Sequence, residues 1–171
     1  LQEGQILSIR KAKRRNMLML SKQHRPDLAK IAEEVELQLL PGYQCADFSA
    51  DVRRLLFSSE FVVSNRSDRM GYCLNGPDVS SGLSGVLSEG ICHGAVQVPP
   101  DGQPIVLLND RQTIGGYPKL GSIISCDTFK LAQCKPGAVV RFAEIDPEQA
   151  HAKILAAHNE RVGVELIVLD S

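Results

Sequence analysis

The densest group of residues that could do chemistry lies between Asn109 and Gly121, in the run NDRQTIGGYPKLG. It offers a carboxylate, a guanidinium, an amide, a phenol and an ammonium, which belong to Asp110, Arg111, Gln112, Tyr117 and Lys119. Such a set can hold an amide-like substrate and stabilise negative charge that develops on an oxygen. The alternative is a Gly-rich hairpin turn that carries a surface ion pair, and the run alone does not decide between the two.

This run follows directly after the apolar segment Pro104–Leu108, which predicts a strand. A strand end would give the polar residues a rigid support. Gly115 and Gly116 come next, and because they lack a Cβ their backbone can approach a ligand closely. The pattern therefore favours a ligand-facing loop, although no nucleophile is obvious in it.

Two further segments also place several polar residues next to glycine or proline. They are SNRSDRMGYCL from Ser64 and SEGICHGAVQVPPDG from Ser88. With them, four runs resemble the family that includes the C-type subunits of bacterial 5-oxoprolinase and allophanate hydrolase subunit 2. These are SDRMGYCL, SEGI followed two residues later by GAVQVPPDGQPIVLL, then DRQTIGGYPKLG, and finally LAQCKPGAVVRF. All four occur here in the family's order, and such an ordered match is more specific than any single motif.

The chain departs from the family pattern at a few positions. Cys73 stands where Arg is usual, and Ile114 stands where Thr is common. Cys92 and His93 replace small residues or prolines. The first departure removes one anion contact that the family would otherwise supply.

The resemblance implies a mainly β fold, a cyclophilin-like β-barrel with a few short helices. Residues 1–171 would be the C-terminal half of a carboxyltransferase-like subunit, with residues 11–30 as an exposed excursion and a related N-terminal half upstream. Since the first residue is Leu1, we expect the chain to begin inside a larger protein.

The resemblance also implies a set of site residues. Those expected to be catalytic are Asp110, Arg111, Lys119 and Glu89. Those expected to bind substrate are Ser67, Arg69, Gln97, Gln112, Tyr117, Gly115 and Gly116. Arg111 and Lys119 would contact an oxyanion or phosphate, and Asp110 or Glu89 would orient a substrate nitrogen or act as a base if its pKa is raised. Structural alternatives remain: Arg69 can form an exposed pair with Asp68, and Glu89 can hold a turn.

The implied activity is the ATP-dependent cleavage of 5-oxoproline to glutamate, by an assembly that also contains homologues of the A-type and B-type subunits, the B-type one in direct contact. ATP would be used by the assembly, and the isolated fragment would be inactive. One alternative is carboxyl transfer from carboxybiotin to a urea-like substrate, in which case biotin would arrive on another domain or protein. Another is a regulatory module that antagonises a kinase inhibitor and pairs with the homologue of the B-type subunit.

Composition narrows the class of protein. The 19 Lys and Arg residues nearly balance the 20 Asp and Glu residues, so no overall field attracts nucleic acid or a membrane surface. No apolar run approaches the roughly 20 residues that span a bilayer. The four histidines stand in separate segments and the five cysteines lack CxxC spacing, so we predict no metal site, reduced thiols and a cytoplasmic location.

Periodicity predicts the elements that must position these residues. Strands are expected where apolar residues alternate or form short runs between turn residues: 35–39, 61–64, 71–74, 95–98, 104–108, 122–125, 138–145 and 165–169. Helices are expected at Asp51–Phe57 with Ser49 or Asp51 as N-cap, at 127–133 with Asp127 as cap, and at Pro147–Arg161.

Overall fold

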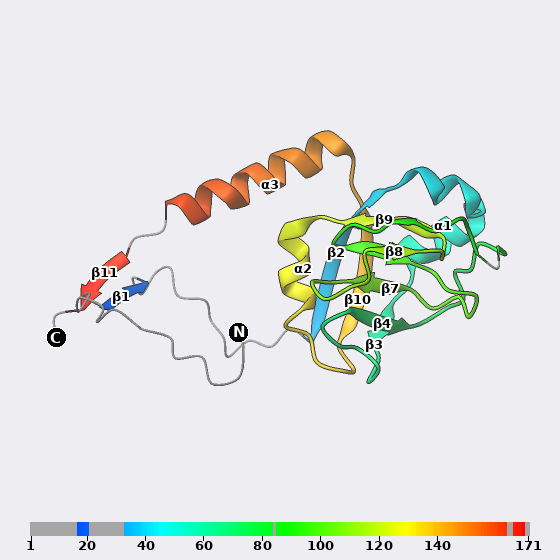
Figure 1. Cartoon of the computed structure of the whole chain (residues 1–171), viewed down its shortest axis with the longest axis horizontal. Helices are drawn as coiled ribbons and strands as arrows, with labels where there is room; N and C mark the ends of the chain where they lie inside the picture. Colours follow the sequence, from blue (N-terminus) through cyan, green and yellow to red (C-terminus); the bar gives the residue numbers. More distant parts are fainter. Residues whose placement is uncertain (1–16, 21–32, 84, 164–165, 170–171) are drawn as a thin grey trace, which may run out of the picture.

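The computed structural model describes residues 17–20, 33–83, 85–163 and 166–169. Within them, seven strands close into a barrel in the order β10-β2-β9-β6-β7-β4-β3 (Figure 1). Their bounds are β2 (Glu34–Pro41), β3 (Phe61–Val63), β4 (Gly71–Asn75), β6 (Ala95–Gln97), β7 (Ile105–Leu107), β9 (Lys119–Ile123) and β10 (Val139–Glu144). β10 pairs with β2 in parallel, and the other neighbours in the barrel pair antiparallel. The expected mainly β barrel is confirmed.

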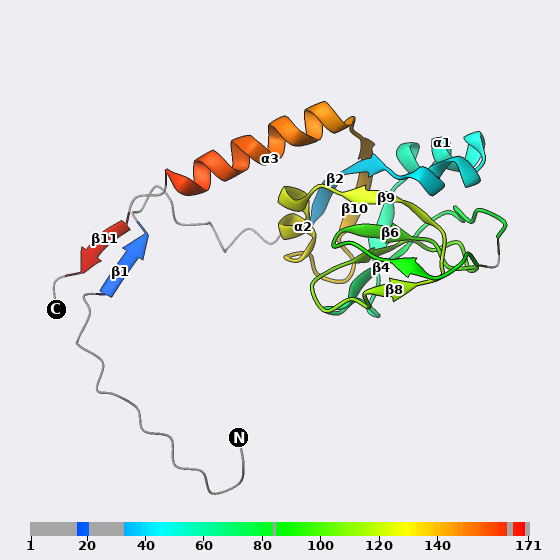
Figure 2. The ribbon, with the colours of Figure 1, turned by 45° about the horizontal axis from the view of Figure 1, so that its top comes forward.

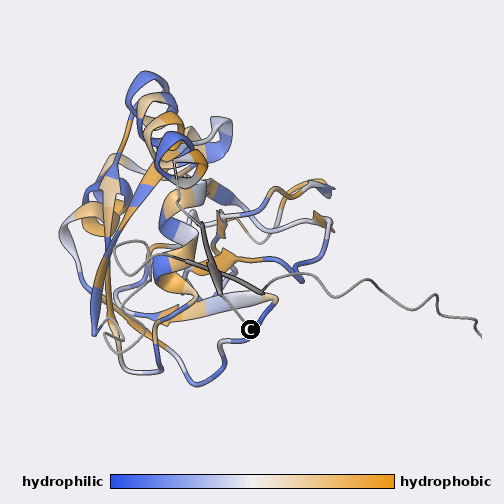
Figure 3. Cartoon of the chain, turned by 90° about the vertical axis from the view of Figure 1, so that its left-hand side faces the viewer, coloured by the Kyte–Doolittle hydropathy of each residue, from blue (hydrophilic) through white to orange (hydrophobic). Residues whose placement is uncertain are grey.

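The barrel core follows from the alternation along each strand. In β2, Val35, Leu37 and Leu39 are buried, while Glu34 and Glu36 are exposed, because successive side chains of a strand point to opposite faces. Figure 3 shows polar and apolar colours together along the barrel strands, and α3 (Pro147–Val162) likewise carries both polar and apolar residues. The inward-facing residues therefore form one continuous core.

The barrel closes where β3 pairs with β10. The rings of Phe61 in β3 and Phe142 in β10 meet there edge to face, with centroids 5.6 Å apart and an interplanar angle of 72°. Both side chains are buried. This aromatic pair joins two strands that are far apart in the sequence.

Helices cover parts of the barrel. α1 (Ala50–Ser58) begins as predicted after Ser49, whose side chain accepts the N–H of Val52 at 3.2 Å. α1 packs against β10, and α2 (Ser125–Leu131) packs against β2. The predicted helix near the C-terminal end is confirmed as α3, and a 3₁₀ turn, η2 (Tyr43–Asp47), follows β2.

The element boundaries around α2 differ from the sequence prediction. The strand expected at 122–125 begins earlier and ends at Ile123, and α2 begins at Ser125, so Asp127 lies in its first turn and does not cap it. The reason is tertiary: the buried carboxylate of Asp127 accepts the backbone N–H of Gln38 at 2.8 Å. Asp127 thus ties α2 to β2.

A separate two-stranded sheet pairs β1 (Met17–Leu20) with β11 (Leu166–Leu169) in antiparallel fashion. Figures 1 and 2 place it beyond the C-terminal end of α3, apart from the barrel. The strand expected at 165–169 is therefore present over Leu166–Leu169. β1 lies inside the range 11–30, and the rest of that range falls outside the described residues, so its exposure stays a prediction.

A close approach of two glycines positions the chain after β2. Gly42 donates its N–H to Leu120 O at 2.9 Å, and Gly121 lies against the backbone of Leu40, Pro41 and Gly42. A side chain at Gly121 would hold the two segments apart. This contact sets η2 beside β9, where the candidate site forms.

We expect Gly121→Ala to destabilise the barrel by about 1–3 kcal/mol, because the added Cβ would lie 2.1 Å from Leu40 O and 2.9 Å from Gly42 N. Backbone atoms of a paired strand cannot move aside cheaply. Chemical denaturation measures the effect, and Gly90→Ala is the matched control, since no atom lies within 4 Å of its added Cβ. Equal unfolding midpoints for the two variants would contradict the steric argument.

Candidate active site

Two of the predicted catalytic residues, Glu89 and Lys119, meet beside the barrel. Glu89 lies in β5 (Glu89–Gly90), which pairs antiparallel with β8 (Ile114–Gly115) to form a short ribbon. A small apolar cluster of Ile91, Ala95 and Leu107, separate from the main core, adjoins this ribbon, since Ile91 follows β5 and donates its N–H to Thr113 O at 2.9 Å. The ribbon thereby holds Glu89 over β9, where Lys119 begins the strand.

The Glu89 carboxylate accepts hydrogen bonds from three side chains. Its Oε1 atom accepts from the Lys119 ammonium and, at 3.0 Å, from Gln44 Nε2. Its Oε2 atom accepts from the Tyr43 hydroxyl. These donors come from η2 and β9, so one carboxylate joins the ribbon to two other parts of the fold.

Gln44 has only one orientation that satisfies its contacts. Its Oε1 atom accepts the backbone N–H of Lys119 at 2.9 Å, which leaves Nε2 to face Glu89 and the Tyr43 hydroxyl, the latter at 3.2 Å. The side chain is buried, with 6% of its surface exposed. Gln44 therefore positions the carboxylate and the start of β9 relative to each other.

The electrostatics of this group keep Glu89 ionised. Hydrogen bonds from Lys119 and then from Tyr43 lower the pKa of the Glu89 carboxyl below its usual value. The same contact with Glu89, followed by burial, raises the pKa of the Tyr43 hydroxyl. A base role for Glu89 required a raised pKa, and the structure shows the opposite direction. Its carboxylate is better suited to hold Lys119 than to accept a proton.

A pocket of about 230 Å³ opens beside this group. Its lining consists of Gly42, Tyr43, Gln44, Glu89, Gly90, Cys92, Lys119, Gly121 and Ser122. On one wall, the Cys92 sulfur and the Ser122 hydroxyl lie 2.9 Å apart. The three glycines present backbone to the pocket, so a small ligand could approach the main chain as well as Lys119.

Gln97, which is buried, and Gln112, which is exposed, both lie close to Gly115. A Cβ on Gly115 would stand 3.1 Å from Gln97 Nε2 and 3.3 Å from Gln112 Nε2. Gln97 is buried, and in the described part of the chain its Nε2 atom has no hydrogen-bond partner. Its backbone pairs with that of Lys119 between β6 and β9. Gln97 is thus near the site but does not line the pocket.

A second group of predicted residues gathers elsewhere. Arg69 and Asp110 form an exposed ion pair at 2.9 Å, and the Asp110 N–H donates to Arg69 O at 3.1 Å. The Ser67 hydroxyl donates to Cys73 O at 3.2 Å. A groove of about 310 Å³ beside them is lined by Asp68, Arg69, Tyr72, Leu108, Asn109 and Ala132, and it shares no residue with the Lys119 pocket.

The Arg111 side chain donates hydrogen bonds to backbone carbonyl groups. Its Nε atom donates to Ile91 O and its Nη1 atom to Leu108 O, both at 3.2 Å. Burial, and then the nearby Arg111 charge, lower the pKa of His93. Arg111 therefore joins the segment after β5 to the end of β7, and its role as an anion contact stays a prediction.

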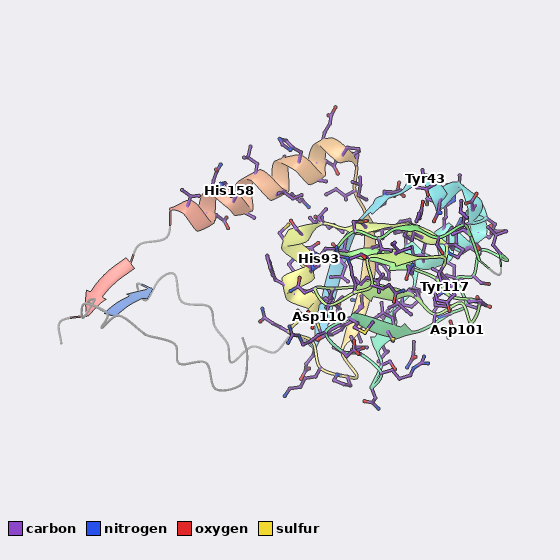
Figure 4. The ribbon with its side chains drawn as sticks, in the orientation of Figure 1. Tyr43, His93, Asp101, Asp110, Tyr117 and His158 are labelled. Atoms are coloured by element: carbon purple, nitrogen blue, oxygen red, sulfur yellow. The ribbon has the colours of Figure 1, made fainter. Side chains whose placement is uncertain are left out.

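Tyr117 and Gly116 belong to the loop between β8 and β9. Tyr117 is 40% exposed and is not among the residues that line the Lys119 pocket. Gly116 accepts the N–H of Val86 through its carbonyl at 2.8 Å. Figure 4 shows Asp110 and Tyr117 well apart on the barrel, with Tyr43 on a third part of it. The predicted motif is thus spread over more than one surface.

Sequence reasoning missed Tyr43, Gln44, Cys92 and Ser122 as parts of the pocket. For Tyr43 and Gln44 the local signal was the Pro41–Gly42 break after β2, which marks a turn without saying what it faces, and Cys92 was noted only as a departure from the family pattern. Within the described residues, no group of three or more His, Cys, Asp and Glu side chains is placed to hold a metal ion. No helix in the described ranges has the length and apolar character needed to cross a membrane.

Comparison with known proteins decides the family. Residues 1–144 match the family described as "Carboxyltransferase domain, subdomain A and B". The chain belongs to this family. Among curated members, it is 39% identical over 115 residues to the 5-oxoprolinase C subunit of Escherichia coli (strain K12), and 36% identical over 116 residues to that of Haemophilus influenzae (strain ATCC 51907 / DSM 11121 / KW20 / Rd). Each alignment covers 67% of this chain and 37% of the relative.

Solved structures agree on the carboxyltransferase-domain fold. A crystal structure of the protein TTHA0988 is 39% identical, with a TM-score of 0.56 over 70% of this chain and 22% of that one. Urea carboxylase of Kluyveromyces lactis is 18% identical, with a TM-score of 0.69 over 77% of this chain and 13% of that one. The second likeness shows the fold alone. In both comparisons, the part that matches this chain is a small share of a much longer protein.

Proposed function

We propose that this carboxyltransferase-family chain is part of a subunit of an ATP-dependent 5-oxoprolinase, a hydrolase that opens a cyclic amide. The observation that carries the proposal is the 36–39% identity to two 5-oxoprolinase C subunits, although the chain spans only 37% of their length. The activity would belong to an assembly with homologues of the A-type and B-type subunits, with the B-type one in direct contact. We expect that assembly in the cytoplasm.

The Lys119 pocket is the part of the substrate site that this chain would contribute. Lys119 offers an ammonium, and Ser122 and the backbone of three glycines offer groups that can bond an amide. The Gln44 side chain accepts the backbone N–H of Lys119, and the Glu89 carboxylate pairs with the Lys119 ammonium. The pocket volume of about 230 Å³ suits a small ring and not a large cofactor.

We assign no residue of this chain to ATP or biotin. An ammonium can pair with a carboxylate or a phosphate, so the donor set does not single out either compound. ATP enters the proposal only as a substrate of the assembly. Biotin would enter only if the reaction were carboxyl transfer.

The test is to purify the full-length protein with the homologues of the A-type and B-type subunits and to follow glutamate release from 5-oxoproline with ATP. We expect ATP-dependent release by the complete assembly and none by this chain alone, since the chemistry requires the other subunits. Omitting ATP, or omitting the protein that contains this chain, should abolish release.

Other outcomes would overturn the proposal. Stable binding to the B-type homologue without turnover would favour the regulatory module. Consumption of bicarbonate and a urea-like substrate with a biotin-bearing partner would favour carboxyl transfer. Turnover by this chain alone would contradict the need for an assembly.

A further inference from the structure

Three hydrogen-bond donors of different chemistry converge on a single carboxylate beside the barrel. They are the Lys119 ammonium, the Gln44 amide and the Tyr43 hydroxyl, and they contact both oxygens of Glu89. One salt bridge would suffice to neutralise an exposed glutamate. A cation with two directed neutral donors is instead the kind of set that proteins use to bind a carboxylate group specifically.

The segments that carry these donors are anchored by contacts that do not involve Glu89. Gln44 is fixed through its Oε1 atom, which accepts the Lys119 N–H at 2.9 Å, and its side chain is buried. Lys119 begins strand β9, and its side chain is only 12% exposed. η2, which carries both Tyr43 and Gln44, is anchored at its start by the Gly42 N–H bond to Leu120 O. The backbone that carries the three donors would therefore keep its place if Glu89 moved away, and the Tyr43 side chain, which is 75% exposed, could turn toward a ligand.

Glu89 itself is held much more loosely. Its strand β5 has only two residues and pairs within its sheet with the equally short β8. The Glu89 side chain is 30% exposed, and the nearby Leu87 is 92% exposed. No described atom would lie within 4 Å of a Cβ at Gly90, so there is open space beside the strand. A released Glu89 could therefore be solvated at little structural cost.

We propose that Lys119, Gln44 and Tyr43 form a binding site for the carboxylate group of a small ligand, and that Glu89 fills this site as an internal placeholder. A ligand carboxylate and Glu89 compete for the same donors, because two carboxylates so close together repel each other. The ligand end beyond its carboxylate would occupy the pocket of about 230 Å³. Because a ligand must displace Glu89 from these donors, Glu89 would lower the affinity of the site for the ligand.

The proposal rests on the proposed function only where it names the ligand. 5-Oxoproline carries a carboxylate next to its ring amide, so it has a group for the donor site and a group for the pocket. The donor site itself is inferred from the contacts of Glu89, whatever reaction the assembly performs.

The experiment titrates the folded chain with acetate and follows the side-chain amide signals of Gln44 and the backbone amide of Lys119 by NMR. We expect Glu89→Ala to bind acetate at least about tenfold more tightly than the wild-type chain, because the competing carboxylate is gone. Glu60→Ala is the matched control: it removes the same charge from an exposed residue paired with Arg141, and it should leave acetate affinity unchanged. Adding Lys119→Met to Glu89→Ala should remove the gain.

The proposal is overturned if Glu89→Ala binds acetate no more tightly than the wild-type chain, if Glu60→Ala shows the same gain, or if the gain survives Lys119→Met. Should Glu89→Ala fail to fold, Glu89→Gln keeps the side-chain size and must still bind acetate more tightly than wild type.

A matched pair of ligands then separates this proposal from the proposed function. In the Glu89→Ala chain, 5-oxoproline should bind more tightly than pyrrolidin-2-one, which has the same ring amide without the carboxylate. Equal affinities would contradict a carboxylate site. If the assembly does not cleave 5-oxoproline but the chain still binds acetate as expected, only the proposed function is contradicted, and the carboxylate site stands.

Discussion

Replacing Lys119 by alanine in the complete assembly is expected to lower kcat/KM for 5-oxoproline by about 10- to 100-fold, the effect of losing one charged hydrogen bond to substrate. Lys119 lines the pocket, and its side chain is largely shielded from water. The fold should survive, because the bond that ties β9 to Gln44 uses the backbone N–H of Lys119 and not its side chain. Steady-state kinetics of glutamate release measure the loss.

Whether the loss in kcat/KM appears in KM or in kcat identifies the role of Lys119. A rise in KM with little change in kcat would show that it anchors the substrate carboxylate equally in ground and transition states. A fall in kcat would show that it faces charge that develops during ring opening. Lys135→Ala, which removes an exposed ammonium elsewhere, should match wild type. Unchanged kcat/KM in Lys119→Ala would refute the assignment of the site.

Replacing Phe61 by alanine is expected to destabilise the chain by about 3–5 kcal/mol, which is a large part of the stability of a typical domain. Its side chain is fully buried, and its ring packs edge to face on Phe142 across the strand pair that closes the barrel. The vacated space cannot collapse easily, since β3 is paired on both sides, with β10 and β4. Urea or thermal unfolding, followed by circular dichroism, measures the loss.

Val62→Ala is the neighbouring control. Val62 follows Phe61 in the same strand but faces outward and is 38% exposed, so its truncation should cost less than about 1 kcal/mol. If the two variants unfolded at the same denaturant concentration, the inward and outward faces of β3 would be wrongly assigned.

Most elements of this fold follow from patterns that are local in the sequence. The alternation of Val35, Leu37 and Leu39 defines the buried face of β2 without reference to any other strand. Ser49 caps α1 through a bond to Val52, three residues away. Local signals of this kind succeed because the partners are neighbours in the chain.

Local patterns failed at Asp127 because its partner is distant. An aspartate before an amphipathic segment reads as an N-cap, and Asp127 would satisfy that pattern. Its carboxylate instead accepts the N–H of Gln38, 89 residues away. That bond exists only because β2 passes beside α2 in the folded barrel.

The sequence by itself determined the family, the barrel class and two members of the pocket, Glu89 and Lys119, because ordered motifs and short alternating strands are properties of the chain alone. Only the tertiary structure decided that Tyr43 and Gln44 complete the pocket, while Asp110 pairs with Arg69 on another surface. Glu89 lies 45 residues from Gln44 and 30 from Lys119, and no periodicity relates residues at such separations. What joins them is the closure of the barrel, in which β2 and β6 flank β9 and the Gly42–Gly121 contact sets η2 against it.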